Sequence, residues 1–342
     1  MPRFLSRFIK NLLNWFSILN ICRIICNKKE LVPILIYHRI GEDFNTKTDK
    51  SSFYLKKLLV SKKRFEKQIK YLTGKYNVIS LTEYLNKKLR GENLSGYAVV
   101  TFDDGFKDFL TIGLEILNKY NCPATVFIIG DATETIYWKH KLYSILDCAE
   151  IKFINFKVTP ELNIDISLVN AQKKQQTLNA LLEIIEQYPD TQKENIIERI
   201  KKVLNVSKEI KPDELYLTKN DLAILYKENI INIGAHSMSH NNLTNLNTSN
   251  ITKEINDSVD VIKKLTKNDM LLYSSPFGGY NEKIIEILKE KNFVCNLTGD
   301  FGLNKKDEDN YRLKRIFITE ESLSEFVYKV SGFEMFYRNL FY

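Results

Sequence analysis

Short apolar runs alternate with amphipathic segments along most of the chain. The apolar runs predict buried strands at residues 32–40, 77–80, 97–102, 123–129, 230–235, 270–275, 293–297 and 315–318. Helical spacing of apolar residues predicts helices at 61–72, 109–120, 218–228, 248–265 and 281–291, and another that begins at Leu81. Seven or eight strands that alternate with helices are typical of an α/β fold with a parallel sheet and crossover helices.

The alternation breaks between about residues 132 and 214, where the chain is helical and polar. A small hairpin is expected there from FINFKVTP and LNIDI, at 153–160 and 162–166. The stretch contains no cluster of potential metal ligands. We interpret it as a helical insertion between two strands rather than as a separate catalytic domain.

Residues 1–30 differ from the rest of the chain, because basic residues there precede a broken apolar run at 12–26. A membrane-spanning helix needs about 20 apolar residues, and no cleavage site of a secretory signal is evident. The pattern favours an amphipathic helix on a membrane surface, and the alternative is a helix packed on the core. The aromatic, basic tail at 331–342 either joins that surface or caps the core.

The composition is that of a globular protein, with 342 residues, 44% of them hydrophobic, and a net charge of +8. The lysines are scattered rather than concentrated in a block, which argues against a nucleic-acid partner and allows attraction to an anionic surface. The five cysteines show no paired spacing and indicate a reducing compartment. Together with the N-terminal segment, this predicts a cytoplasmic protein at the inner face of the cell membrane.

Two adjacent acids, Asp103 and Asp104, end the apolar run in VVTFDDGF. An Asp-Gly pair often marks a solvated turn, so this octapeptide does not by itself indicate a site. Two adjacent carboxylates at the end of a buried strand are nevertheless costly unless something compensates their charge.

Two of the four histidines, His236 and His240, follow a predicted strand in GAHSMSH. Residues four apart on one helical turn face the same side, so two such imidazoles can bind one metal ion. Of the other two, His38 follows the first predicted strand. His140 lies in the polar insertion and is interpreted as structural or as part of a lid.

These side chains are expected to converge, because the C-terminal ends of parallel barrel strands share one rim. Asp104, His236 and His240 would give a three-ligand metal site with an open position for water. Asp103 could then accept a proton from the water that the metal activates.

The motifs TFDDG, HSMSH and SPFGGY together resemble those of the polysaccharide deacetylase family, also called the NodB-homology family or carbohydrate esterase family 4. The resemblance covers roughly residues 31–320, apart from the insertion. It implies a distorted (β/α)7 barrel, which we place at residues 31–330. It also implies metal-dependent removal of acetyl groups from glycans, usually N-acetyl groups of hexosamines.

The resemblance also implies roles for individual residues. Asp103 corresponds to the general base, while Asp104, His236 and His240 correspond to ligands of a divalent metal. The donor set suits zinc, and cobalt or nickel would also fit.

The PFGG segment is similar to the family's third motif, which lines the substrate groove. Here the groove would be lined by Pro276, Phe277, Gly278 and Tyr280, and the backbone N–H of Phe277 would contact the oxyanion.

The chain departs from the family pattern at two places. Ser274 stands where the family often carries an arginine that braces the catalytic acid, and no histidine follows His240 to act as the general acid. His38 is the natural substitute, and Arg315 in the late segment YRLKRIFI is a second candidate. The alternatives are a packed core histidine for His38 and a surface or bracing charge for Arg315.

The sequence therefore predicts a metal-dependent deacetylase of an N-acetylated bacterial surface glycan or lipid-linked saccharide. Two other functions stay open. One is the removal of O-acetyl or formyl groups from similar glycans by the same chemistry, and the other is glycan binding by a catalytically impaired homologue.

Overall fold

The computed structural model describes residues 18–42, 55–158, 163–207, 211–265 and 270–341. The chain divides into two compact units. Unit 1 comprises Met1–Asp49, Leu58–Thr133 and Tyr216–Tyr342, and unit 2 comprises Lys50–Lys57 and Glu134–Leu215.

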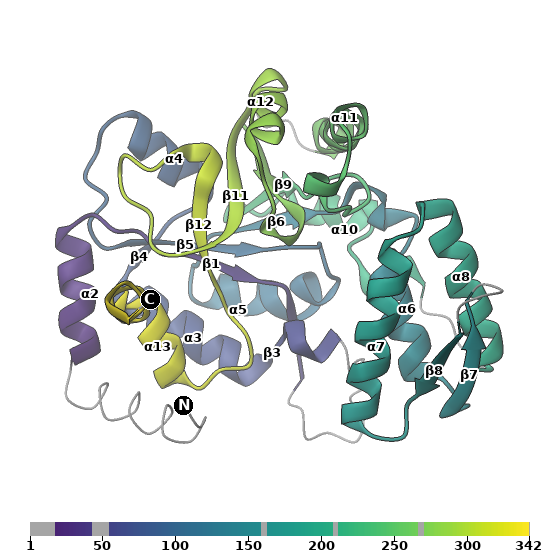
Figure 1. The fold of residues 1–342 in the computed structure, drawn as a ribbon. Coiled ribbons are helices and arrows are strands. Elements are labelled where there is room, and N and C mark those ends of the chain that lie inside the picture. The colour runs from purple at the N-terminus through teal and green to yellow at the C-terminus, as the bar shows by residue number, and fades with distance from the viewer. Residues whose placement is uncertain (1–17, 43–54, 159–162, 208–210, 266–269, 342) are drawn as a thin grey trace. The chain divides into compact units, whose positions relative to one another are not determined.

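Unit 1 is built on a closed barrel of seven parallel strands (Figure 1). In spatial order these are β1 (Ile34–Tyr37), β12 (Leu313–Phe317), β11 (Phe293–Phe301), β10 (Leu271–Ser274), β9 (Ile231–Ala235), β6 (Ala124–Ile128) and β5 (Tyr97–Phe102). The barrel closes because β1 pairs with both β12 and β5. An additional short strand, β4 (Asn77–Val78), pairs with the outer edge of β5. The predicted (β/α)7 barrel is therefore confirmed.

Helices cover the outside of the barrel (Figure 1). They are α2 (Ile18–Lys28), α3 (Lys62–Lys75), α4 (Leu81–Leu89), α5 (Leu114–Lys119), α10 (Lys219–Leu225), α11 (Thr248–Leu265), α12 (Glu282–Glu290), α13 (Leu323–Val330) and α14 (Phe333–Phe341). The apolar face of α3, for example, consists of Phe65, Ile69 and Leu72 and is buried in the large apolar cluster that also contains strand residues. The predicted helix at 109–120 begins as a π-helical turn at Phe109–Gly113 before α5.

Successive side chains of β5 point to opposite faces of the strand, and one of these faces becomes polar at the C-terminal end of the barrel. Ala98, Val100 and Phe102 join the large apolar cluster beneath the outer helices. The intervening Val99 packs in a second apolar cluster, and the next residues of the same parity are Thr101 and Asp103. The side of the strand that begins apolar at Val99 thus becomes polar at its C-terminal end, where Asp103 lies.

The predicted strand at 32–40 is wrong in one respect, because it divides after Tyr37. The segment β2 (Arg39–Gly41) leaves the barrel and pairs in parallel with β3 (Leu59–Ser61). The physical reason is a separate anchor: Asp108 accepts hydrogen bonds from Arg39 Nε at 2.7 Å and from the Ile40 N–H at 3.0 Å.

Unit 2 contains α6 (Trp138–Cys148), β7 (Phe153–Lys157), β8 (Asn163–Ser167), α7 (Ala171–Glu186), α8 (Asp190–Val203) and α9 (Pro212–Leu215). The predicted hairpin is present as the antiparallel pair β7–β8, with Ile154 opposite Ile166. Leu142, Leu181 and Ile197 are buried, one on each of its three longer helices, and give the unit its own apolar core.

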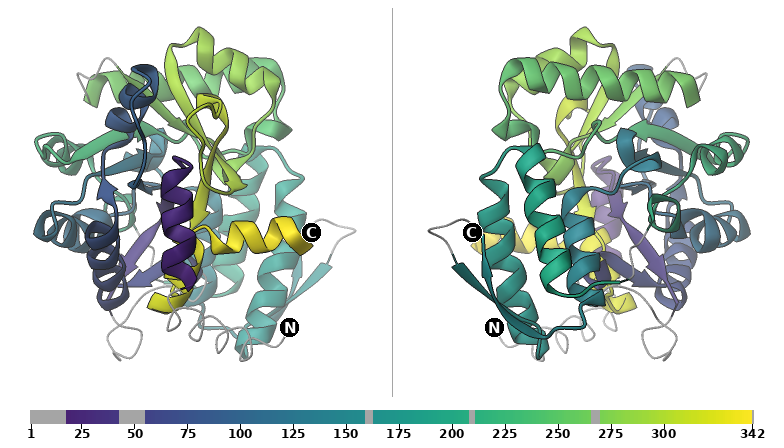
Figure 2. Two further views of the ribbon diagram at one scale, coloured as in Figure 1. Left: turned by 90° about the vertical axis from the view of Figure 1, so that its left-hand side faces the viewer. Right: turned by 90° about the vertical axis from the view of Figure 1, so that its right-hand side faces the viewer.

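The N-terminal helix is described only from Ile18, so residues 1–17 of the predicted amphipathic segment lie outside the described residues. The part seen as α2 buries Leu19 and Cys26. The C-terminal tail forms helix α14, which lies next to α2 (Figure 2). Within the described ranges, no helix combines the length and apolar character that crossing a membrane requires.

Candidate metal and active site

Asp103 and Asp104 end β5 in different backbone conformations. The Asp103 N–H continues the sheet by donating to Tyr37 O at 3.0 Å, and its side chain is buried. Asp104 then takes a left-handed conformation with φ 69°, and Gly105 follows with φ 68°. This turn gives the two carboxylates different neighbours. Left-handed conformations are costly outside glycine and concentrate at functional sites.

The HSMSH segment is an irregular loop, which corrects the expectation of a helical turn. Ser237 and His240 have φ values of 58° and 59°, so the backbone cannot continue as a helix. Glu254 holds the loop by accepting hydrogen bonds from the N–H groups of Met238 and Ser239 at 3.0 and 2.9 Å. The two imidazoles still converge, with ring centroids of His236 and His240 4.8 Å apart.

Asp104, His236 and His240 bring three donor atoms together within 4.8 Å of one another, and all three residues are buried. Asp104 Oδ1 lies 3.1 Å from His240 Nε2 and 3.4 Å from His236 Nε2. His236 Nδ1 is 2.7 Å from the carbonyl oxygen of Ser274, which leaves its Nε2 directed at the cluster. Metal-binding histidines commonly have such a second partner, so these residues fit a divalent cation.

The charges of the cluster stabilise an ionised carboxylate. Burial alone would raise the pKa of Asp104, but His240 and His236 hold it well below its ordinary value. Burial lowers the pKa of His240, which favours the neutral imidazole that binds metals. The anionic form of Asp104 and the neutral form of His240 are the protonation states that a cation requires, whereas burial would lower the pKa of His236 but Asp103 and Asp104 outweigh it and raise that pKa.

Asp103 is braced at both carboxylate oxygens. Arg315 donates to Oδ1 at 2.9 Å, and the Ser274 hydroxyl donates to Oδ2 at 3.0 Å. Arg315 Nε also donates to Thr298 O at 3.0 Å, which fixes the guanidinium. Burial would raise the pKa of Asp103, but the charges of Arg315 and His236 keep it below its ordinary value.

His38 follows β1 at the same rim and faces the two acids and Arg315 closely enough for their charges to act on its pKa. Burial is the strongest of these influences and lowers that pKa. Its Nδ1 is buried and has no hydrogen-bond partner among the described residues. The imidazole ring packs edge-on against Phe317 at 5.3 Å.

The PFGG segment forms a short turn, Pro276–Gly278, directly after β10. Phe277 has φ 57°, is 51% exposed, and packs its ring against His240 at 4.9 Å. At Gly278 an added Cβ would lie 2.1 Å from the backbone nitrogen of Gly299, so only glycine fits. Tyr280 donates its hydroxyl proton to Asp300 at 2.7 Å.

The predicted residues His38, Asp103, Asp104, His236, His240, Phe277 and Arg315 therefore gather at one end of the barrel, whereas His140 belongs to unit 2. Sequence reasoning missed two supports of this site: the hydroxyl of Ser274 on Asp103, and Glu254 under the histidine loop. Ser274 directly precedes the SPFGGY motif, which could have drawn attention to it. No motif or spacing near Glu254 in the sequence indicates its role.

Comparisons with known proteins agree with this architecture. A curated Bacillus subtilis (strain 168) protein, YxkH, described as a candidate polysaccharide deacetylase, is 20% identical over 294 residues, which are 85% of this chain and 73% of the relative. The Streptococcus pyogenes deacetylase PplD, solved in complex with acetate, matches with a TM-score of 0.54 and 18% identity over 88% of this chain and 98% of that chain. BC0361, a polysaccharide deacetylase from Bacillus cereus, matches with a TM-score of 0.55 and 18% identity over 88% and 69% of the two chains.

At these identities the solved structures show a shared fold. The family model for polysaccharide deacetylase matches residues 90–295, which is more than half of the 342 residues and includes Asp103 and the three residues of the donor cluster. The chain therefore belongs to the polysaccharide deacetylase family, whose members are hydrolases that remove acetyl groups from glycans.

Proposed function

We propose that this glycan deacetylase removes N-acetyl groups from a bacterial surface glycan or a lipid-linked saccharide, with Asp103 as the general base. The observation that carries the proposal is that the two adjacent acids have different contacts. Asp104 lies 3.1 Å from His240 within the donor cluster, while Asp103 is held by Arg315 and Ser274. An acid braced in this way keeps its position beside a metal site without serving as a ligand.

Amide hydrolysis requires an activated water, stabilisation of the developing oxyanion, and a proton for the leaving amine. When bound by Asp104, His236 and His240, a divalent cation, most simply zinc, supplies Lewis acidity for the first two needs. Asp103 accepts the proton that the attacking water loses. The backbone N–H of Phe277, in the turn after β10, is the proposed protein contact to the oxyanion.

His38 is the proposed donor of the proton to the leaving amine. It shares the rim with Asp103 and Asp104, and its buried Nδ1 makes no hydrogen bond to any described residue. Arg315 is the weaker candidate, because a guanidinium is not deprotonated in proteins. Its contact with Asp103 at 2.9 Å supports a positioning role instead.

The exposed rim supports a sugar substrate. The half-exposed ring of Phe277 lies against His240, so an apolar sugar face can pack there beside the donor cluster. Tyr280, farther along the same segment, and its partner Asp300 on β11 provide polar groups. We therefore place the groove along Pro276, Phe277, Gly278 and Tyr280.

The test compares Asp103→Asn with Asp104→Asn in the full chain. We expect Asp103→Asn to keep its metal and lose activity by about a thousandfold or more, and Asp104→Asn to lose both. Substrates that carry N-acetyl, O-acetyl and N-formyl groups on the same sugar identify the acyl group. Unchanged hydrolysis by Asp103→Asn would contradict the base assignment, and release of only O-acetyl or formyl groups would contradict the N-acetyl proposal.

A further inference from the structure

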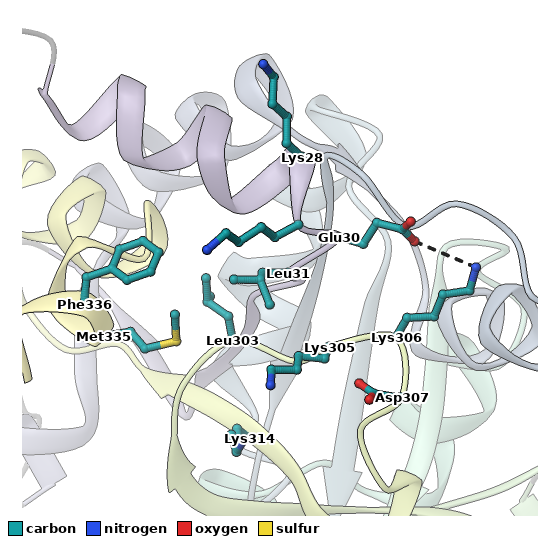
Figure 3. A pocket seen from close by; sticks show the side chains of 11 residues that line it. Lys28, Glu30, Leu31, Leu303, Lys305, Lys306, Asp307, Lys314, Met335 and Phe336 are labelled. Carbon is teal, nitrogen blue, oxygen red and sulfur yellow. Dashed lines mark ion pairs between the residues drawn. The ribbon is translucent and has the colours of Figure 1, made fainter. Parts of the chain in front are cut away.

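A cavity of about 900 Å³ in unit 1 lies between α2, the segment after β11 and α14 (Figure 3). We call it the lysine pocket, after the five lysines that line it: Lys28, Lys29, Lys305, Lys306 and Lys314. Glu30 and Asp307 are its two acidic lining residues, so five positive and two negative charges leave an excess of three positive charges.

Much of this charge has no acidic partner among the residues that the structure describes. Lys306 pairs with Glu30 at 3.9 Å, and Lys314 pairs with Glu308 at 3.0 Å. The remaining lysines, Lys28, Lys29 and Lys305, make no ion pair with any carboxylate of the described residues. A concave surface with several unpaired lysines attracts an anion such as a phosphate group.

The pocket also has apolar walls. Leu31 and Leu303 are nearly fully buried, and Met335 and Phe336 of α14 face them across the cavity (Figure 3). Gly332, just before α14, packs closely against Cys26 of α2, because its backbone has φ 80° and an added Cβ would lie 2.5 Å from Cys26 Sγ. A ligand that fills the pocket therefore needs an apolar part beside its anionic group.

An apolar stripe on α2 leads to the pocket. Ile21, Ile24 and Ile25 are 54%, 46% and 40% exposed, and with Lys28 they occupy positions i, i+3, i+4 and i+7 of one helix face. On the neighbouring helix α14, Leu340 is 75% exposed. Exposed apolar residues that end in unpaired lysines are typical of a helix at the boundary between lipid headgroups and acyl chains.

We propose that the lysine pocket binds the phosphate headgroup of an anionic lipid in a membrane surface, with the isoleucine face of α2 at the acyl boundary. A free phosphate would satisfy the lysines but would leave the apolar walls and the isoleucine face in water. Leu31 precedes β1 and His38 follows it, so the pocket and the candidate active site belong to opposite ends of this strand. The lipid contact is thus independent of the proposed catalytic function.

The test measures binding of the full chain to vesicles in a flotation assay. Wild type is expected to bind phosphatidylcholine vesicles that contain about 40% phosphatidylglycerol, and not to bind vesicles of phosphatidylcholine alone. The triple variant Lys28→Gln, Lys29→Gln, Lys305→Gln should bind about tenfold or more weakly, because each lysine near an anionic surface contributes to the attraction. The pair Ile24→Gln, Ile25→Gln should weaken binding without unfolding, since both side chains are already exposed.

The matched control is Lys227→Gln, Lys263→Gln, Lys264→Gln, which removes three charges from exposed positions on the α10–α11 side of unit 1. It should bind vesicles within about twofold of wild type, because these lysines lie away from the pocket. Deacetylation of a soluble glycan fragment should be unchanged in every variant, so failure of either proposal can be recognised separately.

Three results would overturn the lipid proposal. The first is that the triple lysine variant of the pocket binds vesicles as strongly as wild type does. The second is loss of binding only when residues 1–17 are removed, which would place the contact in that segment. The third is binding of glycerol 3-phosphate to the lysine pocket by a protein that does not bind vesicles, which would identify a soluble phosphate ligand.

Discussion

Arg315, in the last barrel strand, donates a hydrogen bond to Asp103 Oδ1 at 2.9 Å, across 212 positions of sequence. Both side chains are almost completely buried. A buried ion pair is retained only where its geometry compensates for the loss of water. Here the pair holds the carboxylate of the proposed general base, together with the hydroxyl of Ser274 on its other oxygen.

Replacement of Arg315 should therefore affect turnover more than substrate binding. We expect Arg315→Met to lower kcat by about 100-fold or more with KM within about threefold, because Asp103 loses its brace while the groove is intact. Arg315→Lys keeps the charge without the fork geometry and should recover part of kcat. Equal losses in both variants, or a change in KM alone, would contradict a positioning role. Thermal unfolding must be measured alongside, because breaking a buried pair is itself destabilising.

Ser274→Ala should lower kcat by about five- to tenfold, since it removes the hydroxyl that donates to Asp103 Oδ2. Ser275→Ala is a matched control, because its equally buried hydroxyl donates to Asn296 instead. The control should lose a similar amount of stability but keep its kcat. A similar kcat for the two variants would show that the Ser274 contact does not position the base.

His38→Gln should slow amide hydrolysis far more than hydrolysis of an aryl acetate. The departing amine needs a proton, whereas a phenolate leaving group departs without one. We expect a loss of about 100-fold or more on the amide and less than about fivefold on the ester. Equal losses on both substrates would contradict the role of His38 as the proton donor.

Removal of metal should lower thermal stability together with activity. A ligand that binds only the folded state stabilises it, by about 2.7 kcal/mol at a concentration of 100 times its Kd. We expect EDTA to lower the Tm of wild type by several degrees and added zinc to restore it. His240→Gln should show no such response, because it lacks one of the three donors. A wild-type Tm that is insensitive to both treatments would count against a resident metal.

Asp221 allows a prediction about pH. It completes the N-terminal cap of α10 by accepting from the Thr218 N–H at 2.8 Å, and it pairs with Lys107. Burial would raise the pKa of Asp221, but the bonds from Lys107 and Thr218 keep it below its ordinary value. The resulting stability is present above that ordinary value, near pH 4, and is lost as the pH falls through the lowered pKa.

Asp221→Asn should therefore cost about 1–2 kcal/mol of unfolding free energy at pH 7. The difference from wild type should shrink as the pH falls below about 4, where Asp221 is protonated first in the unfolded chain, and should be lost once the pH passes the lowered pKa of the folded state. Chemical denaturation at a series of pH values measures both. Asp260→Asn, at an exposed position of α11, should change stability by less than about 0.5 kcal/mol at either pH.

Local patterns were enough to predict the barrel strands and the clustering of side chains at their ends. The apolar run at 97–102 coincides with β5, and the helix predicted at 248–265 coincides with α11. Both signals are local, since strand burial and helical spacing act over a few residues. The spacing of His236 and His240 correctly predicted that they converge, although the reason is a loop with two left-handed residues rather than a helix.

The contacts that position the base could not be predicted in the same way. Arg315 meets Asp103 only because β12 and β5 both pair with β1, and nothing near Arg315 in sequence indicates this closure. The hydrogen bonds that Arg39 and Ile40 donate to Asp108, where the chain divides into β1 and β2, are likewise contacts between distant segments. Tertiary pairing overrides local patterns at such places.

The closure of the barrel by its first and last strands also has a consequence for the timing of biosynthesis. A ribosome adds Arg315 of β12 to the chain 212 positions after its partner Asp103. A nascent chain that stops before β12 would lack the Arg315 guanidinium that contacts Asp103. It would also lack the strand that pairs with β1 to close the barrel. The contact that orients Asp103 and the pairing that closes the barrel are thus both completed by β12.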